Sequence, residues 1–438
     1  MNILFLCNKP KVGNDANTIV DHIEAFEQYS QHKIWICSNL GDIPLKLGLE
    51  KFDVIIIHYS LCLLHDYFLT AKAKQRIREY KGLKVVFIQD EYRQVNRIID
   101  AFAYMELDAI FTCFPEEEME RIYPQSKLPG TAKYNNLTGY VPERLTQIRG
   151  QTPIADRPLH VGYRGRKVQF WLGELAYEKW SIVEKWQEYT QQSNLKSDLS
   201  YREHDRIYGA NWIQFVSSCK ASLGVESGAS VIDFTGDLEK NIDYYQMTHP
   251  NESFESVQKK FLLSHEGKYK LNQISPRCFE AIALKTVLVL YEGEYSGILE
   301  PGRHFIPLKK DFSNISEVVS KLHDNEYLQN MADVAYEEIA LNHKYSYQTF
   351  IQNFDDIINN EFTARAKKRV AAPYNQSDYD KALQSISLKS KFYKNRLTIF
   401  QKLPPSLRLV VKGIFRPKTT LKLFAKQLCM LLNKKKNS

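Results

Sequence analysis

The sequence is poor in cysteine, and its cysteines follow no metal-binding or disulfide pattern. Seven are scattered over 438 residues, an odd number with no C-x-x-C pair. This distribution excludes a disulfide framework and a structural zinc site, and it is typical of reduced thiols in the cytoplasm. The carboxylates and histidines form no cluster with metal-ligand spacing either. We therefore expect a cytoplasmic protein that needs no cofactor and no bound metal ion.

Long hydrophobic runs are also missing. No apolar stretch approaches the roughly 18 residues that a membrane-spanning helix needs. The start, MNILFLCNKPK, has no basic region before its apolar residues, so it predicts a first strand instead of a signal peptide. Residues 7–14 contain one glycine and no G-x-G-x-x-G motif, which argues against a nicotinamide-binding domain.

Acidic residues are nearly absent from the segment 363–438. Nineteen lysines and arginines face only Asp378 and Asp380, which gives this segment a net charge of +17 and leaves −9 for the first 362 residues of a chain whose total is +8. Apolar residues alternate with the cations at helical spacing, a pattern typical of helices on an anionic bilayer. We predict a basic tail, peripheral on the inner face of a membrane. Packing against the body or a partner is the alternative, and nucleic acid is not expected because no recognition motif is present.

The first 362 residues are long enough for two domains, and strands alternate with helices throughout. Such alternation predicts parallel, doubly wound sheets. The segment 144–158 contains one glycine and two prolines and lacks periodicity, so we take it as a linker between domains 1–150 and 151–362. The predicted strands are 3–6, 33–37, 54–57, 84–88, 109–113, 159–161, 221–225, 286–290 and 305–307. The predicted helices are 16–30, 61–80, 91–104, 116–122, 170–189, 208–218, 244–263, 275–284, 315–322, 326–341 and 347–362.

The loop that follows the first strand of the second domain is basic. It reads Gly-Tyr-Arg-Gly-Arg-Lys at 162–167, and its glycines let backbone amides approach a ligand closely. Together with the cations Arg164, Arg166 and Lys167, they predict an anion site. A solvated basic turn is the competing interpretation.

The stretch 274–308 combines a capped helix, a buried strand and a polar loop. Ser275 suits the N-cap and Pro276 the first helical position, and Glu280 interrupts an otherwise apolar helix one turn later. A carboxylate there either compensates the helix dipole or binds a ligand. Residues 276–290, with their Phe279-Glu280-Ala281 core, resemble the carboxyl-terminal nucleotide-sugar site of retaining GT-B glycosyltransferases of family 4 and the spore-maturation-protein type.

This resemblance implies a GT-B fold, in which two Rossmann-like, doubly wound domains face each other across a cleft. The second domain would bind a nucleotide-sugar donor, with Glu280 at the ribose hydroxyls and the cations of 162–167 at the diphosphate. Binding of the donor is also expected from the start of the helix and from the loop after the buried strand. The residues are Ser275, Arg277, Tyr295, Ser296 and Gly297.

By the same resemblance the first domain would hold the acceptor. His58 and Asp90 follow its third and fourth strands, and ligands bind at the carboxyl ends of such strands. They are our candidates for the group that takes or steers the acceptor proton. Either of them could instead satisfy loop backbone only.

In the family, seven residues separate a second, earlier glutamate from the ribose glutamate, and that spacing leads here to Asn272. We suggest that Glu226, at the end of strand 221–225, contacts the donor sugar, with the excursion 236–270 separating it from Glu280 in sequence only. In the alternative, Asn272 or Gln273 binds the sugar and Glu226 is structural.

The implied activity is transfer of a sugar from a nucleotide-sugar to an acceptor hydroxyl, with retention of configuration, in the synthesis of a cell-surface or lipid-linked glycan. Another phosphate-group transferase with the same cleft is a rival. So is a non-catalytic relative that binds a nucleotide or glycan and assembles partners, which the missing second glutamate keeps open.

Overall fold

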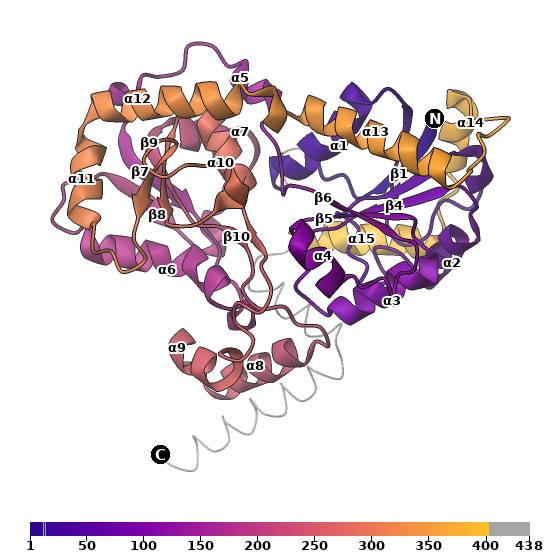
Figure 1. Cartoon of the computed structure of the whole chain (residues 1–438), viewed down its shortest axis with the longest axis horizontal. Coiled ribbons are helices and arrows are strands. Elements are labelled where there is room, and N and C mark those ends of the chain that lie inside the picture. Colours follow the sequence, from indigo (N-terminus) through magenta and orange to yellow (C-terminus); the bar gives the residue numbers. More distant parts are fainter. Residues whose placement is uncertain (12, 14, 403–438) are drawn as a thin grey trace.

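The computed structural model describes residues 1–402 except 12 and 14. It consists of two lobes side by side, each built around a parallel sheet that is covered by helices on both faces (Figure 1). The prediction of two doubly wound domains is therefore confirmed.

The first sheet has six parallel strands in the order β2-β1-β3-β4-β5-β6. Its central strands are completely buried, as continuous apolar runs in parallel sheets are. The sequence analysis missed the sixth strand, because that edge strand is partly exposed and lacks an apolar run. The strands are β1 (Asn2–Cys7), β2 (Lys33–Ser38), β3 (Val54–Ile57), β4 (Leu83–Phe87), β5 (Ala109–Thr112) and β6 (Ala132–Asn135).

The helices of the first domain are α1 (Asn17–Tyr29), α2 (Ala71–Glu79), α3 (Val95–Met105) and α4 (Glu116–Ile122). Two of them begin later than predicted. Residues 61–70 form turns, and α2 starts only where the Thr70 side chain accepts a hydrogen bond from the Ala73 amide at 3.1 Å. Helix α3 starts after Gln94, whose left-handed backbone at φ 49° ends the preceding loop. Residues 89–94 are thus a loop at the end of β4.

The second sheet has five parallel strands in the order β13-β12-β9-β7-β8. The edge strand β8 was also missed, since its sequence Ser-Asp-Leu-Ser is polar. The strands are β7 (Leu159–Arg164), β8 (Ser197–Ser200), β9 (Cys219–Gly224), β12 (Val287–Tyr291) and β13 (Phe305–Leu308). The helices are α5 (Glu143–Thr146), α6 (Glu174–Tyr189), α7 (Gly209–Ser217), α10 (Pro276–Ala283), α11 (Ile315–His323) and α12 (Asn325–Ala335).

An arm, residues 229–271, leaves the second domain between two short strands, β10 (Ser227–Gly228) and β11 (Asn272–Gln273), which pair antiparallel. It extends below both lobes in Figure 1. The helical stretch predicted over 244–263 is interrupted: the arm holds α8 (Asp237–Thr248) and the short α9 (Phe254–Val257), which a π-helical turn over Gln258–Leu262 continues. The arm contacts the first domain, because the Asp233 amide donates to the Tyr92 carbonyl at 2.8 Å.

The chain then returns to the first domain. Helix α13 (Tyr347–Ala364) packs against α1, and Asp355 accepts hydrogen bonds from the Ser30 hydroxyl at 2.9 Å and the Gln31 amide at 2.8 Å. The start of the basic segment stays on this domain. In α14 (Gln376–Leu383) the buried Tyr379 ring lies 4.8 Å from that of Trp35. Helix α15 (Leu388–Lys402) follows, and residues 403–438 of the predicted tail lie outside the described part.

Candidate functional site

Three hollows meet between the carboxyl ends of the two sheets, where ligands of open α/β sheets bind. Their volumes are about 290, 380 and 260 Å³. Within residues 1–402, Asp90 is the one residue that lines all three. We call the first the acceptor-side hollow, because the predicted acceptor domain supplies most of its walls. The second and third are the aromatic and cationic hollows, after the side chains that line them. Asp90 is therefore the point at which ligands in the three hollows would come together.

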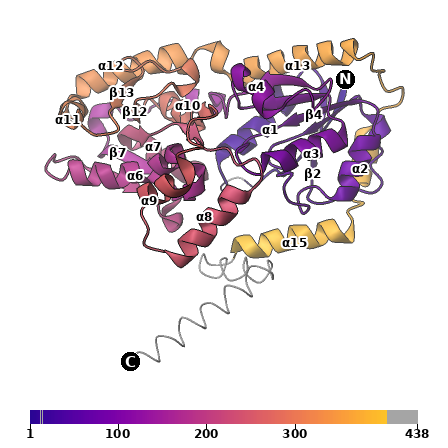
Figure 2. The same ribbon diagram turned by 60° about the horizontal axis from the view of Figure 1, so that its bottom comes forward.

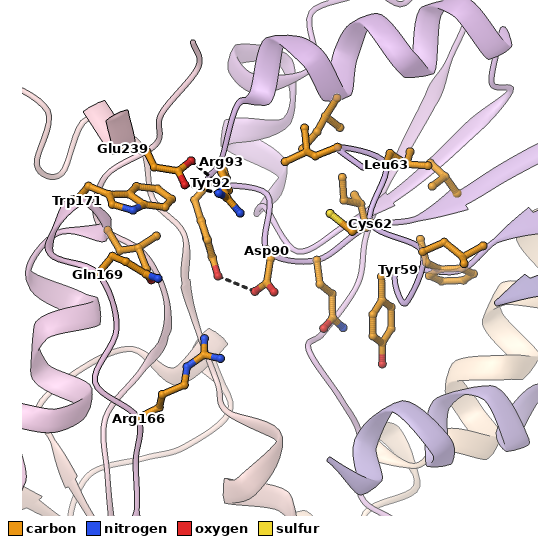
Figure 3. Close-up of a pocket in the computed structure, with 18 residues that line it drawn as sticks. Tyr59, Cys62, Leu63, Asp90, Tyr92, Arg93, Arg166, Gln169, Trp171 and Glu239 are labelled. Atoms are coloured by element: carbon orange, nitrogen blue, oxygen red, sulfur yellow. Dashed lines mark hydrogen bonds and ion pairs between the residues drawn. The ribbon is translucent and has the colours of Figure 1, made fainter. Parts of the chain in front are cut away.

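The loop that carries Asp90 is held in a sparsely populated conformation. Asp90 has a left-handed φ of 56°, and the Tyr92 hydroxyl donates to its carboxylate at 2.8 Å (Figure 3). Beneath it the fully buried Glu91 accepts hydrogen bonds from the Cys113 amide at 2.6 Å and the Tyr123 hydroxyl at 2.5 Å. Burial raises the pKa of Glu91 to about 7. Strain of this kind at a non-glycine residue persists where the surroundings enforce it, often in functional sites.

The cationic hollow is lined by Arg166, Lys179 and Arg277. Lys179 projects from α6, and its ammonium donates to the Gly228 carbonyl at 3.0 Å. Burial lowers the pKa of Lys179 to about 8; Asp90 opposes this shift, and the two arginines add to it. Cations that share one hollow repel each other, and a bound anion relieves that repulsion. The hollow thus has the charge and position to hold a diphosphate.

The sequence analysis did not find Lys179, because a single lysine in a helix with an apolar core face carries no signal. It proposed the cations of the 162–167 loop instead, and of these Arg166 reaches the cationic hollow. Arg164 lines the aromatic hollow, but its guanidinium donates to the Asp198 carboxylate at 2.8 Å and lies 4.3 Å from the Phe215 ring. Lys167 lies over the Trp180 ring at 4.3 Å and lines none of the three hollows.

The aromatic hollow contains Glu280, Trp212 and Tyr208. The Trp212 indole donates to the Glu280 carboxylate at 2.8 Å, and Glu280 is only 5% exposed. Burial raises the pKa of Glu280, while the hydrogen bond from Trp212 opposes the rise. Ser275 and Arg277, at the start of α10, line the same hollow. It therefore combines a carboxylate acceptor with aromatic faces, as a site for a nucleoside requires.

Glu226 lines the cationic hollow, and its carboxylate is occupied by other parts of the protein. One oxygen accepts from the amides of Glu294 at 3.1 Å and Tyr295 at 2.9 Å; the other accepts from the Asn272 side chain at 2.7 Å. The pairing of β10 with β11 brings Glu226 and Asn272 together in space, although the arm separates them in the sequence. Glu226 and Asn272, two of the three candidates for the sugar contact (the third is Gln273), thus lie at one place, and the contact itself stays a prediction.

The loop after β12 is shaped by three consecutive left-handed residues. Tyr295, Ser296 and Gly297 have φ values of 46°, 57° and 68°. The buried Tyr295 hydroxyl donates to the Tyr291 carbonyl at 2.6 Å, and the Ser296 hydroxyl accepts from the Ile274 amide at 3.0 Å. These side chains hold the loop in place and line none of the three hollows, so their predicted donor contacts stay predictions.

His58 lies beneath the cleft. It is fully buried, and its ring nitrogens lie 3.1 Å from His22 Nδ1 and 2.9 Å from the Ser60 hydroxyl. Burial, with a contribution from His22, lowers the pKa of His58 well below its ordinary value. A neutral histidine that lines none of the hollows is poorly placed to reach an acceptor. Its role in proton transfer stays a prediction, and the geometry favours Asp90.

The acceptor-side hollow has walls from both domains (Figure 3). Tyr92 and Trp171 form aromatic walls, and the Trp171 indole N–H is buried without a hydrogen-bond partner among the described residues. Arg93 of the first domain and Glu239 of the arm form an ion pair with an Nε–Oε2 distance of 2.6 Å. In the part of the chain that the structure describes, no group of three His, Cys, Asp or Glu side chains is placed to hold a metal ion.

The two doubly wound parallel sheets, whose carboxyl ends face each other across a cleft, form the GT-B fold that the resemblance implied, and cations and a buried glutamate lie on the second-domain side of that cleft. No family model and no curated protein matches the sequence.

Several solved glycosyltransferase structures are similar. The T4 phage β-glucosyltransferase in complex with UDP-glucose has 10% identity, covers 83% of this chain and 99% of its own, and has a TM-score of 0.45. Anabaena HepE in complex with UDP has 10% identity, 82% and 100% coverage and a TM-score of 0.43. An α1,3-fucosyltransferase has 9% identity, 82% and 91% coverage and a TM-score of 0.41. Similarities at this level do not carry an activity or a substrate to this chain.

Proposed function

We propose that the protein is a glycosyltransferase that moves a sugar from a nucleoside-diphosphate sugar to an acceptor hydroxyl. The observation that carries this proposal is the convergence of three hollows at Asp90. One has a carboxylate and aromatic faces, the second has three cations, and the third has aromatic walls from both domains. A nucleoside, a diphosphate and an acceptor need these three environments at a common reacting centre.

On the donor side, the nucleoside occupies the aromatic hollow, where Glu280 accepts hydrogen bonds from the ribose hydroxyls. The diphosphate occupies the cationic hollow beside Arg166, Lys179 and Arg277. When the glycosidic bond to the diphosphate breaks, negative charge develops on the leaving group. Fixed cations at that place stabilise the transition state more than the ground state, and this is the main contribution to rate.

On the acceptor side, a hydroxyl enters from the acceptor-side hollow and gives its proton to Asp90. General-base catalysis of this kind contributes about 10²–10⁴-fold to rate. The aromatic walls suit a sugar ring, so the acceptor is a glycan or a lipid-linked saccharide. We therefore propose that the enzyme acts in the synthesis of a cell-surface or lipid-linked glycan.

The stereochemical outcome follows from the role of Asp90. The resemblance to family 4 implies retention, whereas a direct displacement with Asp90 as base inverts the anomeric centre. Glu226 accepts hydrogen bonds through both carboxylate oxygens, which weakens it as a nucleophile and favours the direct displacement. The coupling constant of the anomeric proton of the new glycosidic bond, measured by NMR and compared with that of the donor, distinguishes retention from inversion.

A thermal-shift screen against UDP, GDP, CMP, ADP, dTDP and their common sugars tests the donor site. A ligand at 100 times its Kd stabilises the folded state by about 2.7 kcal/mol. We expect one base to respond, and the response to be lost in Glu280→Ala. The matched control is Asp355→Ala, a buried carboxylate of α13 that lines none of the hollows. Silence of the folded protein across the panel would refute the proposal.

One observation favours a second candidate, a non-catalytic GT-B relative that binds a nucleotide or glycan and assembles partners. The carboxylate of Glu226, the residue suggested for the sugar contact, is occupied by protein donors. This candidate predicts a nucleotide response in the thermal-shift screen but no release of nucleoside diphosphate from any nucleotide-sugar, with or without acceptor saccharides.

A further inference from the structure

Helix α15 exposes large apolar side chains at its start. Leu388 is 85% exposed, the highest value among the large apolar side chains of the described part, and Phe392, one turn later, is 58% exposed. Leu45 of the first domain, 52% exposed, lies close to them, because its amide donates to the Ser385 carbonyl at 2.9 Å. We call these three side chains, which neighbouring segments expose, the apolar patch, and exposed apolar groups of this kind mark interaction surfaces.

The patch is held in place by the opposite face of the helix. Ser390 is fully buried, and its hydroxyl accepts from the Asp42 amide at 2.9 Å. The Ser387 hydroxyl donates to the Asp42 carboxylate at 2.8 Å. One side of α15 is therefore fixed to the first domain, and Leu388 and Phe392 point away from it. Figure 2 shows α15 along the lower edge of the molecule.

Positive charge flanks the apolar patch along α15. Lys389, Lys391 and Lys394 are exposed and flank Leu388 and Phe392. The sequence of α15, residues 388–402, contains five lysines and arginines and no aspartate or glutamate. Apolar side chains flanked by cations match an anionic bilayer, where apolar groups enter the acyl boundary and cations meet the headgroups. A protein partner of ordinary surface composition offers no such match.

We propose that α15, with Leu45 beside it, lies on an anionic phospholipid bilayer and fixes the enzyme to the membrane through residues of its folded body. This goes beyond the proposed sugar transfer and does not depend on it. The described helices include none that could cross a membrane, so the contact is with the surface. Each cation near an anionic surface changes the partition coefficient by roughly fivefold at low salt.

Flotation of the full chain with vesicles tests the proposal. One set is phosphatidylcholine alone, and the other contains about 30% phosphatidylglycerol; both are run at low and high salt, where screening weakens surface attraction. We expect binding to the anionic vesicles at low salt and little binding to the neutral ones. The double variant Leu388→Ser/Phe392→Ser is expected to bind at least tenfold more weakly, and Lys389→Glu/Lys391→Glu to lose binding.

Leu341→Ser is the matched control, because Leu341 is also 52% exposed but lies at the end of the second domain. It should bind as the wild type does. Unchanged melting temperature and unchanged nucleotide response in each variant establish that the body is folded. Equal binding of neutral and anionic vesicles would overturn the proposal. So would wild-type binding by the Leu388→Ser/Phe392→Ser variant, since the membrane contact would then lie elsewhere in the chain.

Discussion

Lys179 offers the sharpest test of the proposed donor site, because its buried charge is costly to the free protein and a bound anion would offset that cost. The substitution Lys179→Met keeps the aliphatic stem and removes the ammonium. The lysine pKa falls from 10.5 to about 8 on folding. A lowered lysine pKa means that the charged side chain destabilises the native state. This loss in the free energy of unfolding is fully present below pH 8 and disappears as the pH rises towards 10.5. At pH 7 this cost is up to about 3 kcal/mol.

Lys179→Met should therefore stabilise the ligand-free protein and weaken its binding of the nucleotide. The gain in melting temperature is roughly 3 °C, at roughly 1 °C per kcal/mol for a chain of this length. A hydrogen bond to a charged group contributes about 1.5–3 kcal/mol, so the Kd of the responding nucleoside diphosphate should rise about 10- to 150-fold. Opposite signs for the two effects distinguish a binding residue from a structural one.

The pH dependence of binding gives an independent readout. With a pKa of about 8, Lys179 is mostly charged at pH 7 and mostly neutral at pH 9, so the wild-type Kd should rise about tenfold over this range. Lys179→Arg keeps its charge at both pH values and should remove this dependence. Isothermal titration calorimetry at pH 7, 8 and 9 measures all three proteins.

Two results would refute the reasoning. If Lys179→Met bound the nucleotide within twofold of the wild type, the diphosphate would lie elsewhere. If Lys179→Arg kept the tenfold pH dependence, another group would be responsible for it.

Three further predictions concern the loop at Asp90 and its supports. Asp90→Asn should lower kcat about 10²–10⁴-fold with nucleotide affinity unchanged, as initial rates and calorimetry measure; a full rate would exclude Asp90 as the base. Glu91→Gln should gain up to about 3 kcal/mol in its free energy of unfolding relative to the wild type as the pH rises from 4.5 to 7. The native state binds the Glu91 proton more tightly than the unfolded state does, so the wild type loses stability over this range and the variant does not. Urea unfolding across that range should show this gain, and parallel pH profiles of the two proteins would be inconsistent with it. Glu239→Gln breaks the ion pair with Arg93 and should raise the KM for the acceptor several-fold without changing nucleotide affinity; an effect on nucleotide affinity alone would contradict this.

The sequence was sufficient where local signals are strong. Buried parallel strands are continuous apolar runs, and all nine predicted strands exist. The two missed edge strands of the main sheets, β6 and β8, are polar and partly exposed, because an edge strand is determined by the neighbour it pairs with. The helix starts after residues 70 and 94 also depended on a side-chain cap and a left-handed residue, which periodicity does not reveal.

The predicted site residues divide in the same way. Asp90 and Glu280 were found because strand ends and helix starts are recognisable in sequence, and the structure brings both to the cleft. Lys179 was not, because its neighbours in the hollow, Arg166 and Arg277, are distant in sequence. Arg164 and Lys167 show the converse, since local charge predicted an anion site and the fold turned both side chains to partners within the protein.

By itself, then, the sequence determined the two doubly wound sheets and the polar loops at their carboxyl ends, because apolar periodicity and turn residues act over a few neighbouring positions. Only the tertiary structure decided which polar side chains share a hollow. Burial, repulsion between cations and hydrogen-bond partners depend on groups that the chain brings together from remote positions, as it does for Glu226 and Asn272 across the arm.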